Sequence, residues 1–454
     1  MDKRSIQQEL NEELLNSYLE KKELGKLKEQ ISKYNPVDIK EYIEDLDTKN
    51  MLLVYRLLSK DDAIEVFTEM DLDEQKVLLH AFTDKEMVEI IDELYFDDYI
   101  DLLEEMPAGV VKKILRESDE NKRNMINRFL SYPEDSAGSL MTIEFVELKP
   151  YQTVEEALNI IKKTGVDKVT VYTCYVADEK KTLLGFVSLR KIVTSEPDTK
   201  ISDLMIEDII YVNTDDDQEY VADMFKKYGF VVIPVVDNEK RLVGIITVDD
   251  IMEVMEQEAT EDFQKIAGTL PEDESYMDLS ALRLAKNRLP WLLILMISGA
   301  LSATVLKRYE DVIQAVIALN MFIPMLTDSG GNAGSQASTL VIRAMATGEI
   351  ELKDWPKVIW KECRIGIIAG LVMGIVTFMK CFLFDKVSAT VAITVSMTIF
   401  CIVLIAKVIG AGLPMLAKKL GFDPAIMASP LITTVVDTLG LLTYFEVAKI
   451  ILKI

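Results

Sequence analysis

Oxygen-bearing side chains recur every four residues in the last apolar stretch of the chain. Ser429, Thr433 and Asp437 would share one face of a helix there. An ionised Asp at the centre of a membrane helix costs about 2.5 to 3.5 kcal/mol, so a cation or an aqueous cavity must offset that cost. We expect Asp437 to face a pathway for a divalent cation, with Ser429 and Thr433 lining it. For the two hydroxyls, packing between helices is the alternative.

A second polar stripe occupies an earlier apolar segment, MFIPMLTDSGGNAGSQASTLVIRAM. Asp328, Asn332 and Gln336 again stand four residues apart and are too polar for lipid, so we expect them, Asn332 in particular, to line the same cavity. Ordinary helix packing is the alternative for the small residues. Three glycines are expected either to let backbones approach closely or to unwind the helix: Gly330, Gly331 and Gly334.

Two prolines in these segments remove amide hydrogens that a helix would use. Pro430 is expected to leave the carbonyl of Ile426 without its helical partner, and Pro324 is expected to do the same to Asn320. Irregular polar backbone at membrane depth is tolerated only against protein or a water-filled cavity. Both prolines therefore favour a hydrated cavity.

Carboxylates gather in the segment VDDIMEVMEQEATED at helical contact spacing. Like charges at this spacing repel, so solvent or cations must screen them. A solvated surface is the alternative interpretation for each residue. The acidic residues of this segment are Asp250, Glu253, Glu258, Glu261 and Asp262, and further ones stand at Glu65, Asp97, Asp98, Asp101, Asp215, Asp216, Asp217, Glu219 and Asp423.

The net charge of −25 is concentrated in the first part of the chain. Residues 1–288 hold 36 basic and 64 acidic residues, a balance of −28, whereas residues 289–454 hold 14 and 11, a balance of +3. Such acidity argues against nucleic acid as a partner, because phosphates require Lys and Arg, and it favours cations. Simple solubility is the alternative.

The scarcity of soft ligands restricts the chemistry further. Four widely spaced cysteines without a CxxC pair, and a single histidine, make thiolate or imidazole metal sites improbable, so a hard cation would use oxygen ligands. The sequence has no arrangement of nucleophile and base and no Walker-type loop, so we do not expect an enzyme.

The elements that position these residues follow from the hydrophobic periodicity. Residues 36–130 read as short amphipathic helices, which predicts a small helical bundle or superhelix. The first 22 residues form a charged amphipathic pattern without the apolar core of a signal peptide, so we expect the acidic part to stay in the cytoplasm.

An internal repeat follows the helical region. TVEEALNIIKK and LLGFVSLRKIV resemble DDDQEYVADMFKKYGFVVIPVVD and RLVGIITVDDIM, and each pair reads helix, strand, strand, helix. The repeat resembles a tandem pair of cystathionine-beta-synthase (CBS) domains, and the GIITVDDI ending is its most specific part. After the repeat, an acidic helix and a basic amphipathic segment predict a long connecting helix before the first apolar stretch.

Five apolar stretches complete the chain, each reaching the length of about 17 to 25 residues that spans a bilayer. They cover approximately 289–306, 311–341, 365–384, 387–416 and 425–452. Basic residues before the first stretch and in the second loop place the N-terminus in the cytoplasm and, with an odd number of spans, the C-terminus outside: Arg283, Lys286, Arg288, Arg343, Lys353, Lys357, Lys361 and Arg364.

Across essentially its whole length the chain resembles the MgtE family of magnesium channels and transporters. The segments that carry the resemblance are PMLTDSGGNAGSQASTLVIRA, the CBS pair, the acidic connecting helix and SPLITTVVDTLGLLTYF. The expected fold is a multidomain membrane protein: an all-α cytoplasmic N domain (1–132), α/β tandem CBS domains (133–258), a connecting plug helix (259–288) and a five-helix α transmembrane domain (289–454). The resemblance also implies a homodimer in the lipid bilayer, with a pore on the two-fold axis between the second and fifth spans.

The same resemblance implies the ion and its sites. Asp437 would be the pore carboxylate that meets a largely hydrated Mg²⁺, which sheds water reluctantly and needs few direct ligands. Asp423 would face the plug. Regulatory Mg²⁺ sites would map onto Glu65, Asp97 and Asp101 in the helical domain and onto Asp217, Glu219, Asp250, Glu253, Glu258, Glu261 and Asp262 in the CBS and plug regions.

Two positions depart from the family pattern. Gly229 stands where an Asp ligand is expected, and Ser429 stands where members often have Asn before the pore proline. At least one regulatory site and the pore contacts are therefore expected to differ. The resemblance also implies a nucleotide such as ATP between the CBS units, near Arg190 and Phe230.

The sequence thus predicts a plasma-membrane protein that imports Mg²⁺ and closes when cytoplasmic Mg²⁺ binds its acidic N, CBS and plug regions. Two alternatives stay open. Another divalent cation, such as Mn²⁺, Co²⁺ or Ca²⁺, would suit oxygen ligands equally. A membrane receptor or scaffold could instead use the CBS pair to sense a ligand, with inert helices.

Overall fold

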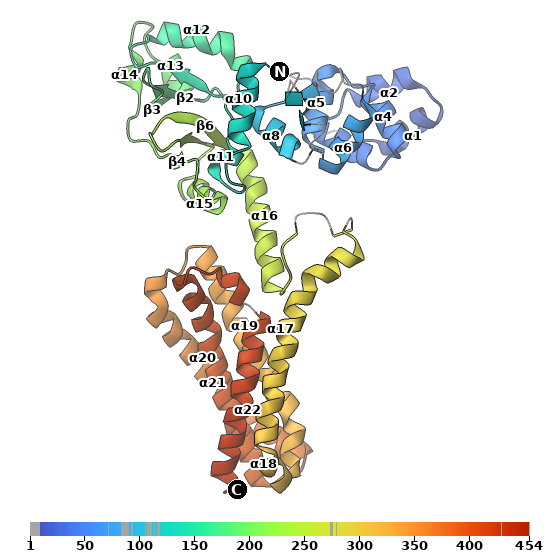
Figure 1. Ribbon diagram of the computed structural model, residues 1–454, viewed down its shortest axis with the longest axis vertical. Helices are drawn as coiled ribbons and strands as arrows, with labels where there is room; N and C mark the ends of the chain where they lie inside the picture. The colour runs from blue at the N-terminus through green and yellow to red at the C-terminus, as the bar shows by residue number, and fades with distance from the viewer. Residues whose placement is uncertain are drawn as a thin grey trace. The chain divides into compact units, whose positions relative to one another are not determined.

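The computed structural model describes most of the chain, which forms two units, Met1–Met255 and Glu256–Ile454 (Figure 1). The described residues are 10–70, 72–82, 90–91, 94–104, 106, 111–112, 114–115, 119–272, 276–277, 279–427 and 429–453. The side chain of Ser429, predicted to line the pathway, lies outside this description.

Short capped helices build the first half of unit one, as the periodicity predicts. Asn, Asp or Ser side chains accept a hydrogen bond from a first-turn amide at Asn11, Asn35, Asp47, Ser59 and Asp119. Buried aliphatic and aromatic side chains join the helices in one core. The helices are α1 (Glu12–Glu20), α2 (Leu24–Ile31), α3 (Pro36–Glu44), α4 (Thr48–Tyr55), α5 (Lys60–Thr68), α6 (Leu72–Ala81), α8 (Phe96–Glu104) and α10 (Glu120–Phe129).

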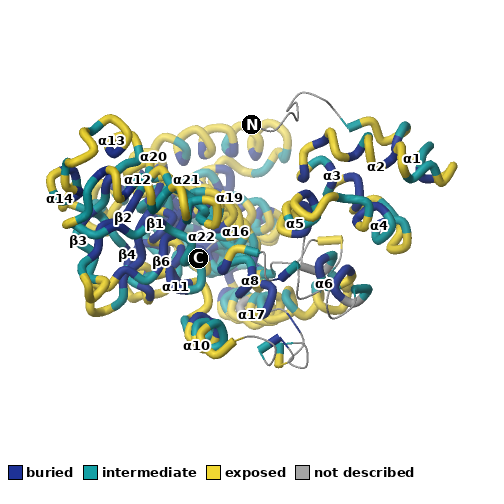
Figure 2. Tube along the Cα trace, turned by 90° about the horizontal axis from the view of Figure 1, so that it is seen from above, coloured by how far each residue is buried: buried dark blue, intermediate teal, exposed yellow. Residues whose placement is uncertain are grey.

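Two three-stranded sheets of the same design follow and confirm the internal repeat. In each sheet the first strand runs parallel to the second, and the third runs antiparallel to it. The strands are mostly buried in Figure 2. The elements are α11 (Ala137–Leu140), β1 (Val146–Leu148), α12 (Val154–Thr164), β2 (Thr173–Ala177), β3 (Leu183–Ser188), α13 (Leu189–Val193), α14 (Ile201–Leu204), β4 (Val212–Asn213), α15 (Gln218–Tyr228), β5 (Val232–Val236) and β6 (Leu242–Thr247).

The connecting helix differs from the prediction for 259–288. Helix α16 (Val248–Ile266) starts directly after β6 and runs through the expected boundary. It ends before Gly268, whose φ of 74° is a left-handed conformation that suits glycine. The next helix begins only at Ala281, after the Ser280 cap, so residues 281–288 belong to the first long helix of unit two.

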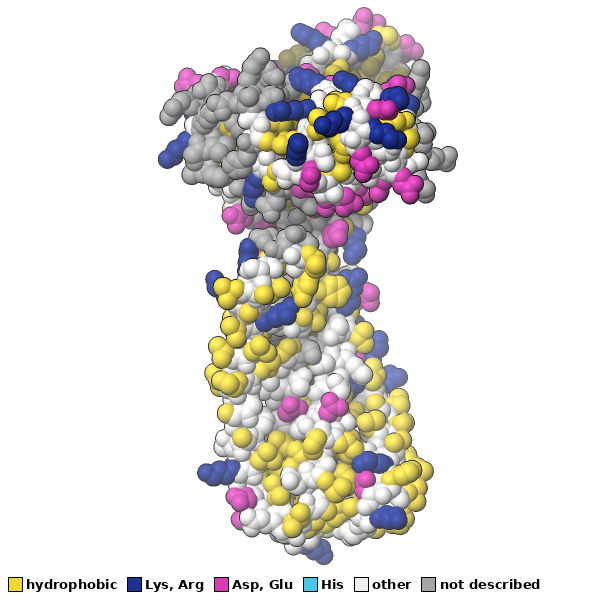
Figure 3. All heavy atoms as spheres, turned by 90° about the vertical axis from the view of Figure 1, so that its right-hand side faces the viewer, with side chains coloured by type: hydrophobic (Ala, Val, Ile, Leu, Met, Phe, Trp, Pro, Cys, Tyr) yellow, Lys and Arg dark blue, Asp and Glu magenta, His cyan; other side chains and the backbone are white. Residues whose placement is uncertain are grey.

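Unit two is a bundle of long helices in which α19, α20, α21 and α22 pack side by side and α17 lies along α22 (Figure 1). In Figure 3 the surface of this unit mixes hydrophobic side chains with polar side chains and backbone, and two acidic side chains lie close together at mid-height. By length and composition, α17, the segment Leu352–Phe384 and α21 could cross a membrane. The helices are α17 (Ala281–Arg308), α18 (Glu310–Ala315), α19 (Ile323–Ala346), α20 (Trp355–Met379), α21 (Ala389–Lys419) and α22 (Ser429–Leu452).

The second predicted span, 311–341, was wrong at its start. Residues 310–322 form α18 and the short 3₁₀ helix η2 (Ile317–Phe322), and the long helix begins only at Ile323. The prolines explain why the prediction failed. Pro324 and Pro430 stand at the first turns of α19 and α22, where no intrahelical amide bond is lost. The carbonyl of Asn320 accepts the amide of Ile323, so it is not left free.

The glycines of α19 serve close packing and do not unwind the helix, which is continuous. A Cβ at Gly331 would lie 2.8 Å from the Thr433 methyl, and one at Gly334 would lie 2.8 Å from Ile432. On the α21 side, a Cβ at Gly410 would overlap the Gly334 carbonyl oxygen. The packing alternative is therefore confirmed for these glycines, and α19 sits against both α21 and α22.

Gly410→Ala is expected to destabilise unit two by about 1 to 3 kcal/mol, because the added methyl group must displace the α19 backbone. Gly412→Ala is the matched control on the same helix, since its Cβ would meet Ile359 at 3.7 Å, an ordinary contact. It should gain about 0.5 to 1 kcal/mol from better helix propensity. Thermal unfolding of the purified protein in detergent measures both, and equal shifts would contradict the close approach.

Candidate functional site

Asp437 occupies the ninth position of α22, among residues that pack against α19 and α17. Its Oδ1 is buried and has no hydrogen-bond partner among the described residues. Asp328 of α19 is the charged group that acts on it electrostatically. A buried, unpartnered carboxylate oxygen facing a second carboxylate is costly unless a cation or water approaches both. The two carboxylates thus favour a positive charge at this position.

The polar stripe of α19 is exposed in the single chain. Asp328, Asn332 and Gln336 all present exposed side chains at the four-residue spacing that the sequence indicated. Thr433 of α22 turns toward this helix, and its hydroxyl lies 3.4 Å from that of Ser335. Thr433 therefore contacts α19 directly, in addition to sharing a face with Asp437.

Two charged residues within the apolar helices escaped the sequence reasoning. Lys407 of α21 and Glu362 of α20 are 6% and 7% exposed. The ammonium group of Lys407 donates to Gln336 Oε1 at 3.1 Å, and Glu362 attracts it electrostatically. A Lys within an apolar stretch is rare because it costs several kcal/mol in a membrane. The presence of Lys407 in such a stretch was therefore a sequence signal that indicated this pair. The hydrogen bond from Lys407 holds Gln336, which stands at one end of the polar stripe of α19.

A carboxylate cluster in unit one joins α8 to the start of α16. Asp97, Asp98 and Asp101 lie on α8, and the charged groups that chiefly act on them include Asp250 and Glu253. Loss of water around the carboxyl group, followed by repulsion from Asp250, raises the pKa of Asp98 to about 7. The same two effects, desolvation and acidic neighbours, raise the pKa of Asp97 and Asp250. Asp97 and Asp101 of the helical domain are thus brought together with Asp250 and Glu253 of α16.

The local chain explains how Asp250 is held in this cluster. Helix α16 starts directly after β6, and the Asp250 carboxylate accepts hydrogen bonds from the hydroxyl and the amide of Thr247. Asp250 is therefore fixed in the first turn of α16. The apolar residues of α8, such as Tyr99 and Leu103, are buried and fix the other side of the cluster.

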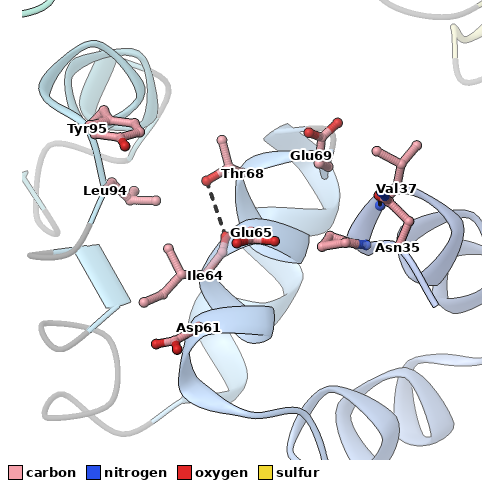
Figure 4. A pocket seen from close by; sticks show the side chains of 10 residues that line it. Asn35, Val37, Asp61, Ile64, Glu65, Thr68, Glu69, Leu94 and Tyr95 are labelled. Carbon is pink, nitrogen blue, oxygen red and sulfur yellow. Dashed lines mark hydrogen bonds between the residues drawn. The ribbon is translucent and has the colours of Figure 1, made fainter. Parts of the chain in front are cut away.

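Glu65 lies elsewhere on the helical domain. With Asp61 and Glu69 it lines a cavity of about 450 Å³ between α3, α5 and the segment before α8 (Figure 4). The α5 carboxylate that acts on Asp98 is Glu69, one helical turn after Glu65. Sequence reasoning named Glu65 and missed Glu69, although the two share one face of α5.

The predicted residues of the second CBS unit have local structural roles. Asp217 caps α15 by accepting the amide of Glu219, and both side chains are exposed. Gly229 ends α15 with φ of 66°, a left-handed conformation that accounts for glycine where an Asp was expected. Of the predicted nucleotide contacts, Arg190 is exposed on α13, and Phe230 stacks on Tyr228 with centroids 5.4 Å apart.

The end of α16 meets the loop before α22 within unit two. Lys265 pairs with Glu261 at 2.7 Å and with Asp423 at 2.8 Å. Burial, followed by the nearby charge of Asp423, raises the pKa of Asp262. Glu258, one turn earlier, has partners of its own. In the described part of the chain no three carboxylate, His or Cys side chains already form a cage for a metal ion.

Comparisons with known proteins cover the whole length. The family model MgtE, described as divalent cation transporter, matches residues 323–447, the model of the MgtE intracellular N domain matches 34–135, and the CBS model matches 137–197 and 201–257. The magnesium transporter MgtE of Thermus thermophilus is 36% identical over 97% of this chain and 98% of its own. That of Bacillus subtilis is 31% identical over 92% of both chains.

Solved structures resemble the first half of the chain. The cytosolic domain of the Mg²⁺ channel MgtE, determined in complex with ATP, is 35% identical, with a TM-score of 0.51. It covers 54% of this chain and 100% of its own. The soluble part of a magnesium transporter is 30% identical, also with a TM-score of 0.51, over 55% of this chain and 98% of its own.

Asp98→Asn is expected to stabilise α8 at high pH in metal-free buffer. The pKa of Asp98 is about 7 in the folded state and about 3.9, the ordinary value, in the unfolded state. Between these two pH values the folded state binds more protons than the unfolded state, so its stability falls as the pH rises toward 7. Amide hydrogen exchange of α8 should be roughly tenfold slower in the variant than in wild type at pH 8, and the difference should narrow toward pH 5. Glu41→Gln, an exposed acid on α3, is the control. A difference independent of pH would contradict the assignment.

Proposed function

Because this chain belongs to the MgtE family of divalent cation transporters, we propose that it carries Mg²⁺ across the membrane along the face of α22 that holds Asp437. Members of this family are transporters, so the chain is not an enzyme. The relatives named as magnesium transporters support Mg²⁺ as the ion.

The observation that carries the proposal is the unpartnered Oδ1 of Asp437 in the middle of a long helix. A cation attracted there would be shared with Asp328, and Asn332 would extend the polar lining along α19. Mg²⁺ keeps most of its water shell, and few direct ligands suffice for it. Ser429 and Thr433, on the same face, would contact that shell.

Regulation by cytoplasmic Mg²⁺ is the second part of the proposal. Burial first, and then acidic neighbours, raise the pKa of Asp98, Asp101 and Asp250. Mg²⁺ would relieve the repulsion between these carboxylates and hold α8 against α16. Low Mg²⁺ would let the cluster loosen and the pathway open. The further proposed regulatory ligands are Glu65, Asp97, Asp217, Glu219, Glu253, Glu258, Glu261, Asp262 and Asp423.

Direction and assembly complete the proposal. An ion pathway that closes when the internal Mg²⁺ concentration is high suits import across the plasma membrane. The basic residues near the membrane spans favour an orientation with the acidic N-terminal half in the cytoplasm. A homodimer would place two copies of Asp437 on one axis. ATP at the CBS units, near Arg190 and Phe230, is supported by the related domain solved with ATP.

Asp437→Asn is expected to reduce Mg²⁺ flux by about tenfold or more, because the amide removes the charge that offsets dehydration of the ion. Flux into proteoliposomes, followed with a Mg²⁺-sensitive dye, measures this effect. The control is Asp311→Asn, which removes an exposed acid on α18. Normal flux in Asp437→Asn would favour the alternative of a CBS-containing receptor or scaffold. Parallel assays with Mn²⁺, Co²⁺ and Ca²⁺ decide between ions.

Limited proteolysis tests the regulatory part. Mg²⁺ is expected to slow cleavage of the wild-type chain around α8 and α16 several-fold, because it neutralises the carboxylate cluster. Asp98→Asn combined with Asp250→Asn should be protected already without Mg²⁺ and should respond little to it. Na⁺ at equal ionic strength is the control for screening. Equal cleavage of wild type with and without Mg²⁺ would contradict the proposal.

A further inference from the structure

Lys407 of α21 is a buried cation that reaches the polar stripe of α19. It is 6% exposed, and its ammonium nitrogen lies 3.1 Å from Gln336 Oε1. It stands three residues before Gly410, where the backbones of α21 and α19 meet, so both residues share the side of α21 that faces α19. Glu362 of α20, itself 7% exposed, attracts the ammonium group. Lys407 therefore interacts with two neighbouring helices at once.

The sequence of α20 makes room for this lysine. A Cβ at Gly366 would lie 3.5 Å from the Cβ of Lys407 and 3.0 Å from Leu404, so α20 approaches α21 closely there. Glu362 precedes Gly366 by one helical turn and shares its face of α20. Burying two opposite charges costs desolvation, and apolar residues of similar volume often fill such positions at lower cost. The role of the lysine must therefore be sought in what it contacts.

The hydrogen bond from Lys407 decides how the Gln336 amide is turned. An ammonium group has three donors and no acceptor, so only the oxygen of the amide can meet it. Gln336 is exposed whereas Lys407 is buried, so the amide turns its oxygen inward and its nitrogen toward the exposed side of the stripe. The nearby positive charge also polarises the amide and makes its N–H groups better donors.

This amide stands at one end of the stripe. Gln336 follows Asp328 by eight residues, about 12 Å along the helix. The loop after α19 contains Lys353 and Lys357, which favour the cytoplasmic side, so Gln336 would lie on the cytoplasmic side of Asp328. Water molecules bound to Mg²⁺ point their hydrogens outward and need acceptors around them. Asp328 offers such acceptors, whereas the inward turn of the Gln336 oxygen withholds one.

We propose that Lys407 is a positioning residue of the ion pathway, which withdraws the oxygen of Gln336 from a hydrated divalent cation and presents N–H donors in its place. The cation is then held near Asp437 and Asp328 and released beyond them, because the amide of Gln336 does not retain it. The proposal rests on the proposed function, in which Mg²⁺ passes along this face, and gives that pathway a holding end and a releasing end. Lys407 acts through Gln336 and does not itself touch the ion.

A double-mutant cycle on the full-length protein in proteoliposomes tests the proposal. Lys407→Met combined with Glu362→Gln removes both buried charges and leaves the net charge unchanged. The freed Gln336 oxygen should then retain the ion, so the external Mg²⁺ concentration that gives half-maximal flux should fall about fivefold, and maximal flux should fall with it. With Gln336→Met in both proteins, removing the charge pair should change the half-maximal concentration by less than about twofold.

Gln336→Glu is a second variant that keeps all the other partners of the site. It leaves one oxygen on Lys407 and puts another oxygen where the amide nitrogen stands. The half-maximal Mg²⁺ concentration should fall about tenfold, since this oxygen accepts hydrogen bonds from the bound water and the carboxylate attracts the ion. Lys419→Met, which removes an exposed lysine from the last turn of the same helix α21, is the matched control and should behave as wild type.

The outcomes separate this proposal from the proposed function. Wild-type flux together with an unchanged half-maximal concentration in Gln336→Glu, or an equal shift with and without Gln336 when the charge pair is removed, would overturn the role of Lys407 alone. An equal shift would mean that the pair acts through helix packing. Absence of Mg²⁺ flux in wild type would instead refute the proposed function, and this proposal with it.

Discussion

Negative charge that the chain does not neutralise by itself is the constraint on which the rest of the structure depends. In unit one, burial of Tyr99, Ile100 and Leu103 draws α8 into the core, and each such side chain contributes about 1.5 to 3 kcal/mol. The carboxylates of the same helix are carried along into contact with Asp250. Hydrophobic burial therefore supplies the free energy that holds like charges together, and loss of water, followed by repulsion from Asp250, raises the pKa of Asp98.

The two units deal with charge in different ways. In the α8 cluster the chief electrostatic influences are carboxylates, so an external cation has most to contribute there. Near the start of α22, Lys265 supplies an internal positive charge, and within the bundle Lys407 does the same for Gln336. A binding site for a soluble ion can respond to its concentration, whereas a tethered ammonium group cannot.

The sequence predicted what depends on local pattern. The helix, strand, strand, helix repeat, the helical N domain and the long apolar helices are confirmed, because periodicity and caps determine them. Helix starts near Pro324 and Pro430 were misread, since proline in a first turn and proline in a helix interior look alike in sequence. Glu69 and Lys265 were missed because their importance comes from partners distant in the chain, which no spacing rule reveals.

The close packing of α19 restricts where an ion could pass. Its glycine face is filled by α21 and α22, to the point that a Cβ at Gly410 would meet the Gly334 carbonyl, so this face of α19 leaves no space for an ion. The opposite face holds Asp328, Asn332 and Gln336, which are exposed in the single chain and too polar for lipid. Such a stripe requires water on its other side, enclosed by something other than this bundle. A second copy facing it across a two-fold axis would meet that requirement, and it would double the carboxylates that attract the ion.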